Sequence, residues 1–213
     1  MPLFDEATTV KLKEILRGLK ERVQVVFFER EDGCPSCADT RTLLEEIISL
    51  TDKVELKVYD FVLEPDAAVK YGVDKAPAIA VLLPDGTDPG VLFYGAPAGY
   101  EINSFLTALL EASGSSEPPP PELLERIKKI DGNISIKVFV TLSCPYCPAA
   151  VINAHRLAFL NGKIRSEMVE SSSFPDYITK YGVTSVPKTV INDSLDFTGA
   201  EPLDKLVEML EKL

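Results

Sequence analysis

The sequence has little of what many protein classes depend on. It contains no tryptophan, one histidine, one glutamine and four cysteines among 213 residues. No stretch reaches the roughly 18 consecutive apolar residues of a membrane-spanning helix, so no such helix is expected. The first six residues, Met1–Glu6, lack the basic start and apolar centre of a signal peptide. We therefore expect a cytoplasmic protein without a membrane partner.

Basic residues are also in short supply. Lysine and arginine number 22 against 33 acidic residues, which gives a formal net charge of −11. Such a charge argues against nucleic acid binding and favours solubility. A hydrophobic content of 46% is sufficient for globular units. Abundant glutamate and lysine with few thermolabile amides favour a thermophilic source.

All four cysteines fall in two Cys-x-x-Cys motifs, which leaves none for structural disulfides. Cys144 and Cys147 follow the apolar run 136–140 and precede a pattern of helical periodicity. A strand that leads into a helix opening on this motif is typical of a redox site. Helix N-termini favour a thiolate, and i, i+3 spacing brings the two sulfurs together. We expect Pro145 at the first helical position.

A second copy of this pattern lies 110 residues upstream, at Cys34 and Cys37. The same offset relates 71–73 to 181–183, both Tyr-Gly-Val, and Pro77 to Pro187. In each copy the proline follows the first cysteine by 43 residues. Matched features at one offset indicate an internal duplication.

These paired motifs resemble the protein disulfide oxidoreductases of hyperthermophiles, in which one chain holds two thioredoxin-fold units. Each unit is also similar to glutaredoxin, most closely in the motif 144–147 and in Ser185–Pro187. The resemblance covers nearly the whole chain. It implies an α/β fold of two tandem units, each a central mixed β-sheet flanked by helices. We expect an N-terminal unit at 1–115, a Pro-rich linker at 116–121 and a C-terminal unit at 122–213.

Hydrophobic periodicity predicts the same order of elements in both units: helix, strand, helix, strand, helix, two strands, helix. The predicted helices are 5–21, 34–50, 65–71, 100–112, 122–130, 144–160, 174–181 and 202–213. The predicted strands are 23–28, 54–61, 79–83, 91–94, 134–140, 163–170, 188–191 and 195–198.

Thiol–disulfide exchange needs an attacking thiolate and a resolving thiol. We assign attack to Cys34 and Cys144, and resolution to Cys37 and Cys147. The residues inside the motifs are candidate modulators of reactivity, namely Pro35, Ser36, Pro145 and Tyr146.

The resemblance also implies cis bonds at Ala76–Pro77 and Val186–Pro187. The backbone of Ala76 and Val186 would then pair with an extended substrate segment. The alternative is an ordinary trans proline that opens a strand.

One feature of thioredoxin is missing. Its buried aspartate, six residues before the first cysteine, is replaced here by Phe28 and Val138. Asp60 and Glu170, at the ends of the second strands, are either proton carriers or solvated charges. His155 follows Cys144 by eleven residues, about 16 Å along a helix, too far for a catalytic base.

Flanking charges distinguish the two sites. Glu29, Glu31 and Asp32 precede Cys34, whereas residues 141–143 before Cys144 are neutral. Lys188 adds a positive charge beside the second proline. We therefore predict the more acidic thiol at Cys144 and most reductase activity in the second unit.

The favoured function is a dithiol–disulfide oxidoreductase that reduces, forms or isomerises protein disulfides, with no cofactor and no metal. By resemblance, a thioredoxin-reductase-like flavoprotein supplies electrons. Residues 197–201 partly resemble a glutathione-binding turn, so glutathione is an open candidate. Two alternatives remain: a holdase-like polypeptide-binding module, and four thiolates around zinc, although 106 residues separate the motifs.

Overall fold

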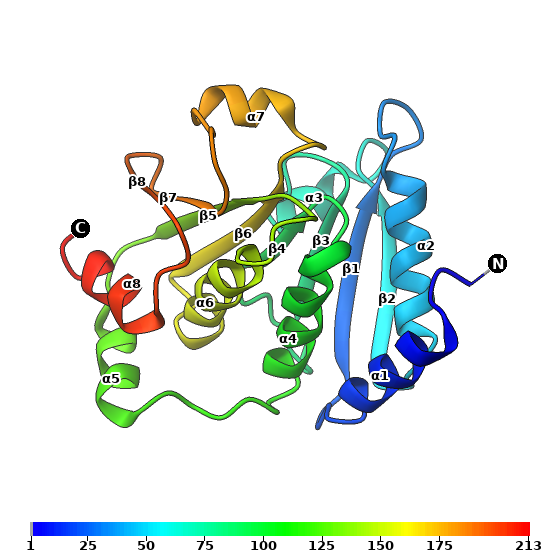
Figure 1. Cartoon of the computed structure of the whole chain (residues 1–213), viewed down its shortest axis with the longest axis horizontal. Helices are drawn as coiled ribbons and strands as arrows, with labels where there is room; N and C mark the ends of the chain where they lie inside the picture. The colour runs from blue at the N-terminus through cyan, green and yellow to red at the C-terminus, as the bar shows by residue number, and fades with distance from the viewer. Residues whose placement is uncertain (1) are drawn as a thin grey trace.

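The computed structural model describes residues 2–213 and contains one continuous eight-stranded sheet (Figure 1). Its strand order is β2-β1-β3-β4-β6-β5-β7-β8. The first half contributes β1 (Val23–Glu29), β2 (Val54–Asp60), β3 (Ala78–Leu82) and β4 (Val91–Tyr94). The second half contributes β5 (Ile134–Val140), β6 (Ile164–Glu170), β7 (Lys188–Ile191) and β8 (Leu195–Thr198).

The two halves repeat one topology and share a seam. β1 pairs with β2 in parallel and with β3 antiparallel, and β3 pairs with β4 antiparallel. β5, β6, β7 and β8 repeat this arrangement. At the seam β4 pairs in parallel with β6, from Val91 opposite Ser166 to Tyr94 opposite Val169. The two mixed sheets expected from the sequence are therefore joined edge to edge.

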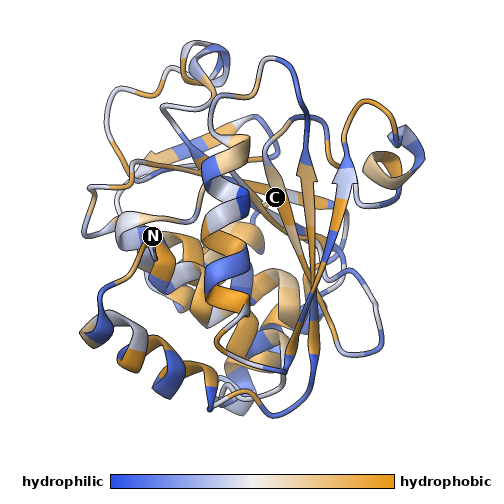
Figure 2. Cartoon of the chain, turned by 90° about the vertical axis from the view of Figure 1, so that its right-hand side faces the viewer, coloured by the Kyte–Doolittle hydropathy of each residue, from blue (hydrophilic) through white to orange (hydrophobic). Residues whose placement is uncertain are grey.

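Helices cover the two faces of the sheet unequally. The larger core lies under α1 (Glu6–Leu16), α2 (Cys37–Ile48), α4 (Ile102–Ala112), α5 (Pro121–Lys129), α6 (Cys147–Leu160) and α8 (Leu203–Leu210). The smaller core lies under two short helices, α3 (Pro65–Lys70) and α7 (Pro175–Lys180). Apolar residues dominate the strands, while the helices are mixed (Figure 2). Alternate residues of β1, such as Phe27 and Phe28, enter opposite cores because successive strand side chains point to opposite faces.

Several predicted helix boundaries are wrong by a few residues. α1 ends at Leu16 rather than 21, because the Gly18 N–H donates to the Ile15 carbonyl at 2.9 Å and turns the chain. α2 and α6 begin at the second cysteine of each motif, not the first. Pro145 therefore lies in a turn ahead of α6 and not at its first helical position. The corresponding turn in the first motif is closed by a hydrogen bond from the Cys37 N–H to the Cys34 carbonyl at 3.1 Å.

The connection between the halves runs from the end of α4 to α5, which begins at Pro121. Its first part is held against the first half, since the Lys20 N–H donates to Ser115 Oγ at 3.0 Å. Met1, where the expected N-terminal unit begins, lies outside the described residues. Over the described range, no helix has both the length and the apolar character needed to cross a bilayer.

Candidate active sites

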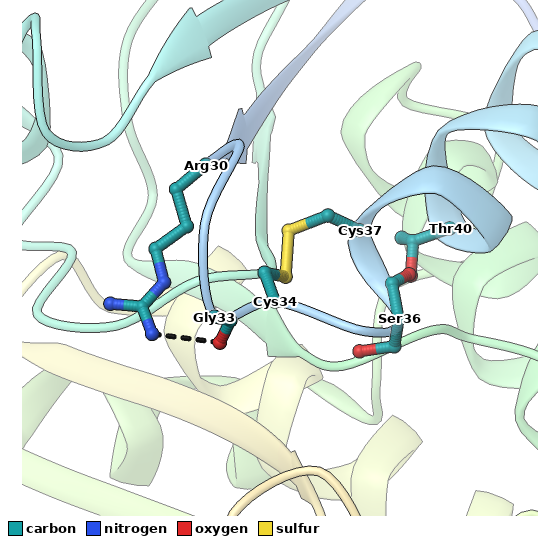
Figure 3. Close-up of a disulfide and its surroundings, with 6 residues drawn as sticks. All are labelled: Arg30, Gly33, Cys34, Ser36, Cys37 and Thr40. Carbon is teal, nitrogen blue, oxygen red and sulfur yellow. Dashed lines mark hydrogen bonds between the residues drawn. A yellow bond between two sulfur atoms is a disulfide. The ribbon is translucent and has the colours of Figure 1, made fainter.

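Both cysteine pairs are closed as disulfides, as the sequence predicts. The Cα atoms are 5.4 Å apart in Cys34–Cys37 and 5.5 Å apart in Cys144–Cys147. Figure 3 shows the first pair, with Cys34 in the turn and Cys37 on the first turn of α2. The second cysteines are the more deeply buried, at 4% exposure for Cys37 and 0% for Cys147. The assignment of attacking and resolving thiols stays a prediction.

The two disulfides lie along one edge of the sheet. β1 and β5 point the same way, because two antiparallel and two parallel pairings separate them. Both motifs follow these strands and therefore lie at their carboxyl ends. Four strand spacings separate β1 from β5, or about 19 Å. Zinc–sulfur bonds are about 2.3 Å long, so the four thiolates do not meet around one zinc ion.

Both predicted cis bonds, Ala76–Pro77 and Val186–Pro187, are present. Each proline directly precedes a strand that pairs with the carboxyl-terminal part of β1 or β5. The prolines are buried at the sheet edge that carries the cysteines. Within residues 2–213, no backbone hydrogen bond joins Ala76 or Val186 to another residue. Their backbone polar groups are therefore free to pair with an incoming strand.

The residues inside the motifs differ in exposure. Pro35 and Pro145 are exposed, and the Tyr146 ring is 73% exposed. Ser36 is half-buried, and its carbonyl accepts hydrogen bonds from the backbone N–H and the hydroxyl of Thr40, at 2.9 and 2.6 Å (Figure 3). These contacts fix the start of α2. A modulating role for these residues stays a prediction.

The charges around the first site are partly compensated. Glu29 Oε1 pairs with Arg41 Nη1 at 2.7 Å. Arg30 Nη2 donates to the carbonyl of Gly33, directly before Cys34, at 2.7 Å (Figure 3). A guanidinium group therefore lies on the approach to this cysteine, beside the acidic residues.

The positive charge expected near the second site is also compensated. Lys188 Nζ pairs with Asp196 Oδ2 at 2.9 Å and donates to the Tyr181 carbonyl at 2.8 Å. Two premises of the predicted difference in thiol pKa are thereby weakened. The order of the Cys34 and Cys144 pKa values stays a prediction, which alkylation rates across pH would test.

A buried carboxyl group, Glu101, was not among the site residues predicted from the sequence. It lies at the end of a short 3-10 helix, η1 (Gly99–Glu101), and its side chain is completely buried. Burial raises its pKa from 4.5 to about 7, although Ser104 Oγ donates to its Oε2. Its Oε1 is buried without a hydrogen-bond partner in the described part of the chain.

Glu101 belongs to the first half but lies beside the second site. η1 packs against α6, and the Tyr100 N–H donates to the Leu142 carbonyl at 3.0 Å. Leu142 is two residues ahead of Cys144. No local motif links Glu101 to this cysteine. The one available signal is an acidic residue just before the largely apolar helix α4.

Other candidate residues have structural partners. Phe28 and Val138, which replace the thioredoxin aspartate, are fully buried. Asp60 and Glu170 accept hydrogen bonds from backbone N–H groups of the loops that follow them. His155 is 2% exposed and its Nδ1 lies 2.7 Å from Ser166 Oγ, so it is structural.

Comparison with known proteins agrees with this geometry. A family model described as "Thioredoxin domain" matches residues 134–212. A protein disulfide oxidoreductase from Aeropyrum pernix K1 superposes with a TM-score of 0.89 at 29% identity, covering 97% of this chain and 92% of that chain. This chain is a tandem thioredoxin-fold protein. Its resemblance to the protein disulfide oxidoreductases is confirmed.

A second group of tandem thioredoxin-fold relatives carries another name. A crystallised domain of alkylhydroperoxide reductase AhpF from Enterococcus faecalis (V583) gives a TM-score of 0.91 at 28% identity, covering 97% of this chain and 99% of that chain. The alkyl hydroperoxide reductase AhpF of Escherichia coli (strain K12) is 28% identical over 209 residues, which is 98% of this chain and 38% of that protein. The chain spans 30 to 38% of the length of the curated relatives that it matches.

Proposed function

We propose that the chain is a dithiol–disulfide oxidoreductase that reduces protein disulfides through both Cys-x-x-Cys sites. The observation that carries this proposal is the repeated site: a cysteine pair at a helix start, beside a cis-proline with free backbone groups. The free backbone binds an extended client, by which we mean a protein with a disulfide to be exchanged.

The reaction balances at each site. The first cysteine thiolate attacks one client sulfur, which breaks the client disulfide and releases the other sulfur as a thiolate. The second cysteine then attacks the mixed disulfide, which closes the site disulfide and frees the reduced client. Two electrons pass from the site to the client. Run backwards, the same steps form or isomerise disulfides.

At the second site we assign proton transfer to Glu101. Cys147 must lose its proton before it attacks the mixed disulfide. A buried carboxyl with a pKa of about 7 is suited to accept it near neutral pH. Because Glu101 comes from the first half, the second site is complete only in the joined molecule.

The relatives suggest partners. Since several are named as alkyl hydroperoxide reductase components, we propose a relay in which a thioredoxin-reductase-like flavoprotein reduces the chain and a peroxiredoxin-type disulfide accepts the electrons. Glutathione remains an open candidate. Cytoplasmic location stays a prediction from the use of all cysteines in redox motifs.

Insulin reduction with dithiothreitol as electron donor tests the activity. We expect turnover by the wild type, partial loss in Cys34→Ser and in Cys144→Ser, and complete loss in the double variant. A double variant as active as the wild type would overturn the proposal and favour the holdase-like alternative.

A further inference from the structure

The loops that follow β2 and β6 share a backbone design but differ in side chains. Asp60 Oδ1 accepts both N–H groups of the Val62–Leu63 pair, each at 2.8 Å. Glu170 accepts both N–H groups of the Ser172–Ser173 pair, at 2.9 and 2.8 Å. The offset of 110 places these pairs at equivalent positions. The first unit therefore presents aliphatic side chains where the second presents hydroxyl groups.

The aliphatic pair is exposed on a well-held loop. Val62 is 63% exposed and Leu63 is 79% exposed. The loop is fastened at both sides, because the Phe61 N–H donates to the Glu29 carbonyl at 2.7 Å and the Asp60 N–H to Glu64 Oε2 at 2.9 Å. A single exposed aliphatic residue is ordinary. Two adjacent ones on a fixed backbone need a reason, and their location supplies it.

This loop borders the first redox site. A surface hollow of about 460 Å³ is lined by both cysteines of the first motif, together with Glu31, Arg41 and Asp60. Asp60 is the residue that holds the Val62–Leu63 loop. A client segment bound to Cys34 therefore lies within reach of the aliphatic pair.

The charges at this edge select the partner. Glu31 and Asp32 are exposed, and neither forms an ion pair with any described residue. Glu29 is neutralised by Arg41. The matching approach to Cys144, residues 141–143, carries no charge. The first site thus combines an aliphatic loop with uncompensated negative charge.

We propose that the Val62–Leu63 loop and the acidic pair Glu31–Asp32 form a client-docking surface that belongs to the first site alone. It takes an extended disulfide-bearing segment with an aliphatic side chain against the loop and a lysine or arginine facing the acidic pair. The proposal rests on the proposed function and adds a division of clients between the sites. The second site, with its serine loop and exposed Tyr146, does not share this preference.

The test uses the intact chain with Cys144→Ser and Cys147→Ser, so that the first site alone turns over with dithiothreitol as reductant. Three synthetic peptides of equal length, each closed by one disulfide, serve as clients. The first carries leucine and lysine beside the disulfide, the second replaces the leucine by serine, and the third replaces the lysine by glutamate. We expect kcat/KM for the first peptide to exceed each of the others by about five- to tenfold, the range of one well-placed side-chain contact.

Variants separate the two parts of the surface. Val62→Ser with Leu63→Ser is expected to abolish the preference for leucine and to keep that for lysine. Glu31→Gln with Asp32→Asn is expected to do the reverse. Val10→Ser, on α1 and 59% exposed, is the control and changes neither ratio. In a chain with Cys34→Ser and Cys37→Ser, the changes Ser172→Val and Ser173→Leu are expected to create a leucine preference at the second site.

The outcomes are distinguishable. If the first site reduces none of the peptides, the proposed function fails for that site and the docking surface fails with it. If all three peptides are reduced equally, or the loop variant keeps its leucine preference, the docking surface is wrong while the oxidoreductase function stands.

Discussion

Glu101 shows how much depends on the surroundings of one side chain. Its complete burial favours the protonated form and raises its pKa from 4.5 to about 7. A group whose pKa is raised by folding stabilises the fold fully below its unfolded pKa, here 4.5, and this contribution is lost as pH rises towards 7. The ionised carboxylate therefore costs stability at the pH where it would accept a proton.

This cost gives a prediction for Glu101→Gln. Because glutamine stays neutral, the variant avoids a loss of about 2–3 kcal/mol in the free energy of unfolding that the wild type undergoes between pH 4.5 and 8. We also expect its reductase rate through the second site, measured in a Cys34→Ser background, to fall at least tenfold near neutral pH. Urea unfolding and insulin reduction across pH are the measurements. Parallel stability curves for the two proteins would contradict the burial of an ionisable group at this position.

At the scale of elements, the strands are the easier part to predict. β5, β7 and β8 have the predicted boundaries, since their apolar runs are bounded by turn residues. The predicted helix starts at the motifs are three residues early. The pattern Cys-Pro-x-Cys begins with a turn, and continuous i→i−4 bonding starts only at the second cysteine, as shown by the Thr40 N–H donating to the Ser36 carbonyl. Propensity does not separate such a turn from the first turn of a helix.

Helix α6 carries the one histidine, and this makes the fold sensitive to acid. Burial lowers the pKa of His155 from 6.5 to about 3, and its Nε2 has no partner among the residues that the structure describes. The native state thus holds neutral imidazole. Its contribution is present above pH 6.5 and is lost as pH falls towards 3.

We therefore expect His155→Gln to flatten the acid limb of the stability curve. Between pH 7 and 4 the wild type should lose about 2–3 kcal/mol more than the variant. Urea midpoints measured at several pH values provide the comparison, with Asn153→Gln, on the same helix, as the control. An acid limb of equal slope in wild type and His155→Gln would show that protonation elsewhere governs acid unfolding.

At the scale of the whole molecule, the seam between β4 and β6 was not predicted. Pairing between strands more than seventy residues apart leaves no local pattern. A signal was nevertheless present, because all four residues of β4, Val-Leu-Phe-Tyr, are apolar and buried. Such a strand is typical of a sheet interior, whereas an edge strand usually carries polar or charged residues. The division into units at 1–115, 116–121 and 122–213 remains a proposal about sequence repeats.

The seam predicts that both halves unfold in one transition. Phe93 on β4 is fully buried, pairs with Met168 of β6, and meets the rings of Phe105 and His155 at 5.6 and 4.7 Å. Its truncation to alanine is expected to cost about 3–5 kcal/mol. Pulse alkylation of the reduced protein in urea reports each half separately, through the buried thiols of Cys37 and Cys147. We expect Phe93→Ala to lower both urea midpoints by the same amount.

A matched variant within the first half makes the test decisive. Phe27 on β1 is equally buried but lies away from the seam. If the continuous sheet makes the chain one cooperative unit, Phe27→Ala also lowers the midpoints of Cys37 and Cys147 together, because no state with one folded half is populated. If Phe27→Ala shifts the midpoint of Cys37 alone, the halves unfold independently. The second site would then keep its core, and with it the reactivity of Cys147, after the first half had opened, which conflicts with a site that draws Glu101 from the first half.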